Sequence, residues 1–170
     1  MTTRRAVLTL AALVLSACGG DKKPAGAAAS VGTDTALAAV TPVADKGAAT
    51  YAQICQSCHQ ATGLGVEGTY PPLKASPWLV GNADVPIAIV LAGLQGEMNV
   101  EGKAFNGIMQ SWAMLSDEDI AAVLTYARSQ WGNAATPIAP AQVKAVRDRI
   151  GNHSAWTSAE LKKEYPGAGG

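Results

Sequence analysis

The chain has 170 residues with 13 basic and 13 acidic side chains, and this length suits one domain with appendages. The charges are unevenly placed, because residues 43–134 carry four bases and eight acids whereas residues 135–170 carry five bases and three acids. An acidic central region argues against nucleic-acid binding. It suits a partner protein with a basic docking patch.

The first residues are typical of an export signal. Arg4 and Arg5 precede an apolar run over residues 6–15 that is too short to span a bilayer. The run ends in Leu-Ser-Ala-Cys, which resembles a bacterial lipobox, where Cys18 would be acylated and become the N-terminus. An ordinary secretory signal cleaved after Ala17 is the alternative. We favour the lipoprotein signal, because Cys18 would otherwise be an unpaired thiol in an oxidising compartment.

We therefore expect residues 1–17 to be the signal and residues 18–42 to be a flexible tether. The tether is rich in Ala, Gly, Thr and Ser and cannot bury enough apolar surface to offset its ordering entropy. As a coil it would span roughly 25–30 Å, and about 80 Å when stretched. The predicted location is the periplasmic side of a bacterial membrane, with the lipid as anchor.

A C-x-x-C-H motif, formed by Cys55, Cys58 and His59, predicts covalent attachment of one c-type haem. Two thiols one helical turn apart can each bond the porphyrin, and His59 can then bind the iron. A thioredoxin-like pair would need a βαβ setting, which the pattern does not show. A zinc site would need two more Cys or His, and only Cys18 and His153 remain.

Residues 43–134 are predicted to form the haem domain. A first helix runs from about Asp45 into the motif, and Gly47 on the face of Tyr51 permits another helix to approach closely. The last helix begins at a capping box at Ser116, carries one apolar stripe as far as Trp131 and stops at Gly132. We expect its Val123 or Tyr126 face to pack across Gly47 and Tyr51.

Between these helices the pattern indicates further haem-contacting segments. A glycine-rich loop over residues 61–68 brings backbone close to a flat cofactor, and a prolyl carbonyl after it could accept the Nδ1 proton of His59. A buried stripe predicts a helix over residues 85–94. Residues 96–103 suggest a loop or short hairpin, and an Asn-Gly turn at residues 106–107 would aim Met109 inward.

Residues 135–170 are expected to be a tail with a short helix over residues 141–150. Its basic residues would form a solvated face, and the glycine-rich end should fray. Three apolar residues pin the tail to the domain in this interpretation: Trp156, Leu161 and Tyr165.

Taken together, the C-x-x-C-H motif, Tyr-Pro-Pro-Leu at residues 70–73, residues 105–109 and the last helix make the chain resemble class I cytochromes c. More narrowly, it looks like bacterial domains that accompany periplasmic nitrite reductases and membrane-bound dehydrogenases or oxidases. The resemblance covers residues 43–134 and implies an all-α fold of about three to five helices around one covalently bound haem.

The resemblance also implies roles for single residues. His59 would be the proximal iron ligand, Met109 the distal ligand, and Pro72 the carbonyl partner of His59, with Cys55 and Cys58 as thioether links. The family usually has a proline after the ligand methionine, whereas this chain has Gln110. Two other methionines stay open as distal ligands, Met98 and Met114, although Met114 would rather pack the last helix as a core filler.

The predicted function is a membrane-tethered, non-enzymatic cytochrome that passes single electrons between redox partner proteins. One alternative is a fixed haem c subunit of a larger dehydrogenase, reductase or oxidase. Another is an open-site haem sensor or peroxidase, which would need a vacant sixth position on the iron.

Overall fold

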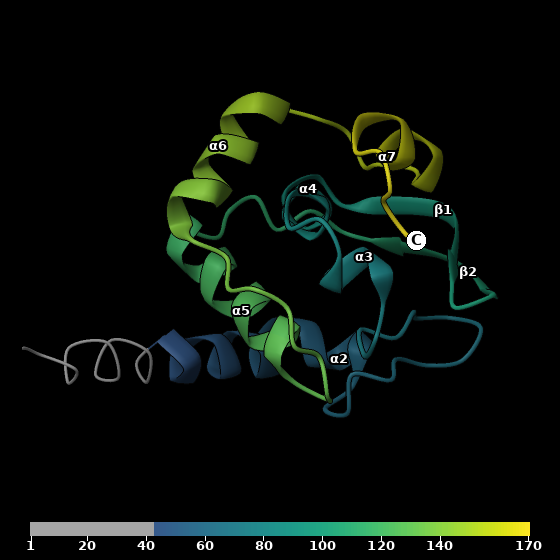
Figure 1. The fold of residues 1–170 in the computed structure, drawn as a ribbon, viewed down its shortest axis with the longest axis horizontal. Helices are drawn as coiled ribbons and strands as arrows, with labels where there is room; N and C mark the ends of the chain where they lie inside the picture. The colour runs from purple at the N-terminus through teal and green to yellow at the C-terminus, as the bar shows by residue number, and fades with distance from the viewer. Residues whose placement is uncertain (1–42) are drawn as a thin grey trace, which may run out of the picture. The chain divides into compact units, whose positions relative to one another are not determined.

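A computed structural model describes residues 43–170, and the predictions for the signal, for Cys18 and for the tether lie outside these residues (Figure 1). The chain is already helical at residue 43 and stays helical through η1 (Tyr51–Cys55) and α2 (Gln56–His59). The η1 segment is a π-helical turn, in which the Gln56 N–H donates to the Tyr51 carbonyl. Such wide turns occur often at functional sites. The predicted first helix is confirmed.

The first helix packs closely on α5 (Asp117–Ser129) at Gly47. A Cβ atom on Gly47 would collide with the Ala122 carbonyl and would lie 2.8 Å from the Tyr126 Cβ. One turn further along, the rings of Tyr51 and Tyr126 are 5.5 Å apart. The predicted crossing of the two helices at Gly47 is therefore confirmed.

Helix α5 begins as predicted and ends earlier than predicted. The Ser116 hydroxyl accepts from the Asp119 N–H at 3.1 Å, which caps the first turn. The helix ends at Ser129, and Trp131 follows with a φ of 56°. The Trp131 indole lies over Gly63 and donates to the Ala61 carbonyl at 2.9 Å, so it covers the glycine-rich loop instead of extending the helical stripe.

The middle of the domain contains α3 (Pro77–Val80) and α4 (Asp84–Ala92). Every residue from Val85 to Ala92 is buried, so α4 is a central helix surrounded by protein and has no polar face. The helix ends at Ala92, and Gly93, with a φ of 86°, turns the chain into a strand. Leu94, predicted to close the helix, opens that strand.

The two strands form an antiparallel hairpin of β1 (Leu94–Val100) and β2 (Lys103–Met109). The turn is made by Glu101 and Gly102, which both have positive φ. The predicted hairpin is confirmed, but the prediction of an all-α fold misses this sheet. The predicted turn at Asn106 and Gly107 is wrong, because the hairpin register places both residues inside β2.

The C-terminal region adds α6 (Pro140–Ile150) and α7 (Ser158–Glu164). Helix α6 packs on α4 and α5, and α7 packs on β1 (Figure 1). Trp156, Leu161 and Tyr165 are buried as predicted. The expected fraying of the glycine-rich end is wrong, because Ala168 is buried and Gly169 lies against the Trp78 ring.

The expectation of a solvated basic face on α6 is also wrong in part. Lys144 is exposed and pairs with Asp148 on its own helix. Arg147 and Arg149 instead form ion pairs with Asp117 and Asp84, outside the tail. Within residues 43–170, no helix combines the length and the apolar character needed to cross a membrane.

We expect Gly47→Ala to lower the free energy of unfolding. Alanine should gain about 1 kcal/mol of helix propensity, but overpacking against a backbone carbonyl costs about 1–3 kcal/mol. Chemical denaturation of the haem-loaded protein measures the net change in the free energy of unfolding.

The exposed Ala49 on the same helix is the matched site, where alanine should be favoured over glycine by about 1 kcal/mol. A stabilised Gly47→Ala protein would show that the two helices do not pack this closely.

Candidate functional site

The motif opens onto a hollow of about 100 Å³ and an adjoining, larger hollow of about 460 Å³. Helix α4, the hairpin, α5 and the loop after the motif supply most of their walls. The residues that line both hollows are Ile54, Cys55, His59, Pro71, Leu94, Met98, Met109 and Trp112. These shared walls join the two hollows into one site.

The two thiols of the motif face this site from consecutive turns. Cys55 ends η1 and Cys58 lies in α2, and both are free, half-buried cysteines. Burial, together with the nearby Cys58, raises the pKa of the Cys55 thiol to about 11. Both sulfurs are thus available for covalent bonds on one side of the cavity.

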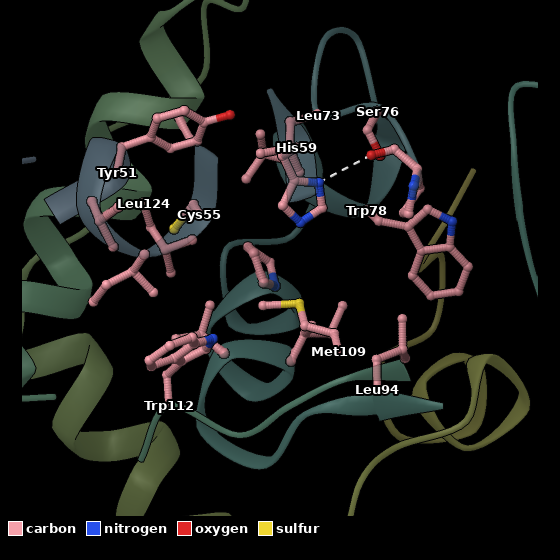
Figure 2. Close-up of a pocket in the computed structure, with 18 of the residues that line it drawn as sticks. Tyr51, Cys55, His59, Leu73, Ser76, Trp78, Leu94, Met109, Trp112 and Leu124 are labelled. Atoms are coloured by element: carbon pink, nitrogen blue, oxygen red, sulfur yellow. Dashed lines mark hydrogen bonds between the residues drawn. The ribbon is translucent and has the colours of Figure 1, made fainter. Parts of the chain in front are cut away.

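The His59 imidazole is oriented by one hydrogen bond. Its Nδ1 lies 3.0 Å from the carbonyl oxygen of Pro71, so the N–H at Nδ1 donates and Nε2 keeps its lone pair. In Figure 2, the other ring nitrogen faces the pocket. Burial lowers the pKa of His59 while the bond to Pro71 opposes this, and the lowered pKa favours the neutral form that binds metals.

The partner of His59 is therefore Pro71 and not Pro72, which corrects the prediction. The glycine-rich loop determines which of the two prolines faces His59. The Gly65 N–H donates to the His59 carbonyl at 3.1 Å, and a Cβ on Gly65 would collide with the backbone of Tyr70 and Pro71. Gly65 has a φ of 64°, which favours glycine. This close approach turns the Pro71 carbonyl toward the imidazole.

The methionines differ in their relation to the cavity. Met109 ends β2, and its sulfur faces the His59 ring across the pocket in Figure 2. Met98 on β1 also lines the cavity and is 5% exposed. Met114 is 77% exposed, so its predicted role as a core filler under the last helix is wrong.

Sequence reasoning missed several walls of the site. Trp112 lines both hollows, and Trp78 forms a wall of the smaller one. Trp112 lies in a short irregular segment, where no helical or strand period marks a buried position. A large aromatic three residues after a candidate ligand was the one available signal.

The cavity fits a haem. The smaller hollow is lined mainly by apolar side chains, as a porphyrin requires, while an imidazole and a thioether face each other across it. The two thiols lie close to His59 in the chain, where they can bond the edge of the porphyrin.

A family comparison agrees with this geometry: the model of the cytochrome c family matches residues 44–131. The chain belongs to the cytochrome c family. Its cofactor is therefore haem c, bound covalently, and Cys55 and Cys58 stand in the attachment motif.

Relatives of two kinds match this cytochrome. Cytochrome c-552 of Thermus thermophilus is 37% identical over 127 residues, covering 62% of this chain and 96% of the relative. The cytochrome c subunit of a quinone alcohol dehydrogenase from Gluconacetobacter polyoxogenes is 32% identical over 121 residues. The fructose dehydrogenase cytochrome subunit of Gluconobacter japonicus is 32% identical over 108 residues. The matches cover only 25% and 22% of these two subunits.

Proposed function

We propose that this cytochrome carries single electrons between redox proteins, with His59 and Met109 as the two axial ligands of the haem iron. The observation that carries the proposal is the apolar cavity in which His59 and Met109 face each other beside the two thiols. Bound haem supplies an iron that reversibly gains and loses one electron. Thioether ligation raises its potential compared with two nitrogen ligands.

The protein's residues keep this chemistry to electron transfer. Pro71 orients the imidazole, so the iron-binding nitrogen needs no rearrangement between redox states. The apolar walls exclude water and peroxide from the iron. Among the described residues that line the cavity, His59 is the one histidine and there is no arginine. Since peroxide cleavage needs such distal groups, the cavity favours electron transfer over a peroxidase. Met109, as the proposed ligand, would fill the sixth position that an open-site sensor needs vacant.

We expect Met109→Ala to remove the near-infrared sulfur-to-iron charge-transfer band of the oxidised protein. The iron should become high-spin or water-ligated, its potential should fall, and the reduced form should bind carbon monoxide. Absorption spectra in both redox states and a redox titration measure these changes.

Two methionine variants serve as controls. Met114→Ala removes an exposed side chain outside the cavity walls and should change nothing. Met98→Ala should keep the band while losing about 2–5 kcal/mol of stability, because Met98 is buried. A band that survives in Met109→Ala and vanishes in Met98→Ala would reassign the ligand.

We further propose that partners dock at the open mouth of the cavity, close to the haem edge. The described residues lining the larger hollow, which this mouth belongs to, carry no acidic or basic side chain other than the half-buried His59. Ile108 on this mouth is 80% exposed, and Val66 and Leu64 on the glycine-rich loop are also exposed. Because this mouth is uncharged and apolar, it favours docking that removes water from apolar surface. The acidic composition had suggested charge complementarity with a basic partner instead.

Electron self-exchange between reduced and oxidised copies tests this surface without a known partner. We expect the self-exchange rate to depend weakly on ionic strength. Ile108→Asp should slow exchange at least about tenfold, because the contact would then bring together two carboxylates, one from each copy. Nuclear magnetic resonance line broadening measures the rate. Met114→Asp adds the same charge at an equally exposed site off the mouth and should have little effect. Equal slowing by both variants would contradict the proposal.

We propose, finally, that the cytochrome is a lipoprotein tethered to the periplasmic side of a bacterial membrane. The support is the run of residues 1–17 with Arg4 and Arg5, followed by Cys18. A fixed place in a larger oxidoreductase is the second candidate, favoured by the dehydrogenase cytochrome subunits among the relatives.

Cys18→Ser should block acylation and the cleavage coupled to it. Fractionation of cells should show wild-type protein in the membrane fraction, because several acyl chains anchor far more firmly than one. Lys22→Ser, four residues away, should behave as wild type. Mature wild-type protein found wholly in the soluble periplasmic fraction would rule out the anchor, and a stable co-purifying dehydrogenase would favour the fixed subunit.

A further inference from the structure

Arg147 of α6 binds the segment that connects Met109 to α5. Its Nε donates to the Asp117 carboxylate at 2.8 Å. Its Nη1 and Nη2 donate to the carbonyls of Ala113 and Leu115 at 2.8 and 2.9 Å. One guanidinium therefore holds three acceptors within five consecutive residues, a geometry that suits the rigid fork of arginine.

The same segment has few other attachments. The Ser111 hydroxyl donates to the Leu91 carbonyl, and the Trp112 N–H donates to the Val90 carbonyl at 2.8 Å. These contacts fix its beginning on α4, and Arg147 fixes its end. Gln110 follows Met109 directly and lacks the fixed φ of a proline. The backbone after the methionine is therefore restrained by these contacts with α4 and α6 and not by its own residue type.

The strand side of Met109 is also supported by the C-terminal region. Met109 pairs with Leu94 in the hairpin. On the other edge of β1, the Trp156 N–H donates to Gly93 and the Trp156 carbonyl accepts from Gln95. Residues beyond the family match at 44–131 thus hold both β1, which pairs with the strand that ends at Met109, and the segment that follows Met109.

We propose that Arg147 is a positioning residue that keeps the Met109 sulfur on the iron. The inference rests on the proposed role of Met109 as distal ligand. Charged hydrogen bonds are the stronger kind, and this guanidinium is only 30% exposed, with 23% for its Asp117 partner. Without Arg147, the segment over residues 113–117 loses its attachment to α6, and the methionine is free to leave more often.

Arg149 provides a matched control on the same helix. It pairs with Asp84 at 2.8 Å and joins the tail to the start of α4, away from the segment after Met109. Removal of Arg149 takes away its bonds to Asp84 and Tyr165 and leaves the three bonds of Arg147 and the backbone bonds of Trp156 in place. Lys144, which pairs with Asp148 inside α6, controls for the loss of a charge alone.

The test compares Arg147→Gln, Arg149→Gln and Lys144→Gln as haem-loaded, full-length proteins. Carbon monoxide can bind the reduced iron only while Met109 is away, so its binding rate follows the fraction of open protein. We expect Arg147→Gln to raise this rate about tenfold and weaken the near-infrared band. The other two variants should stay within about twofold of wild type. Urea unfolding of each protein reports global stability separately.

Two outcomes would overturn the positioning role. One is an unchanged carbon monoxide rate in Arg147→Gln, and the other is an equal rise in Arg149→Gln at an equal loss of stability. The ligand assignment fails separately, if Met109→Ala keeps the band. In that case the positioning role falls with it, whereas an unchanged Arg147→Gln leaves the proposed function intact.

Discussion

The hydrogen bond between His59 Nδ1 and the Pro71 carbonyl is the contact on which the site depends. It fixes the tautomer and the plane of the imidazole, so the second nitrogen points into the cavity. The loop that supplies the carbonyl is itself set by Gly65 and Gly63, where bulkier residues would collide with backbone or with Trp131. A close-packed loop, and not a charged group, therefore orients the imidazole that we propose as the proximal iron ligand.

The opposite wall is constructed differently. Met109 ends β2 and pairs with Leu94 of β1, and the C-terminal tail bonds β1 on its other edge. Arg147 and Trp156 reach this wall from a region beyond the family match. The rigid side of the cavity is thus local in sequence to the attachment motif, whereas the methionine side is assembled from distant segments. Under the proposed positioning role, these distant contacts take the place of the proline that usually follows the ligand methionine.

Charge has a smaller part in the proposed docking than composition suggests. The haem-binding region is acidic overall, yet the mouth of the cavity is lined by uncharged side chains. Several charges are used internally: Lys46 pairs with Asp119, and Arg147 and Arg149 bind acids of the main domain. The opposite net charges of residues 43–134 and 135–170 therefore serve partly to join these two regions to each other.

The sequence by itself determined the haem attachment, the first and last helices of the domain and their crossing at Gly47, because these depend on short spacings and helical periods. It favoured Met109 among four methionines through a resemblance. Only the tertiary structure decided that Pro71 faces His59, that residues 106–107 lie in a strand, and that the arginines of α6 bind the domain. Those features depend on which distant backbone groups meet, and a local pattern of residue types does not encode such register.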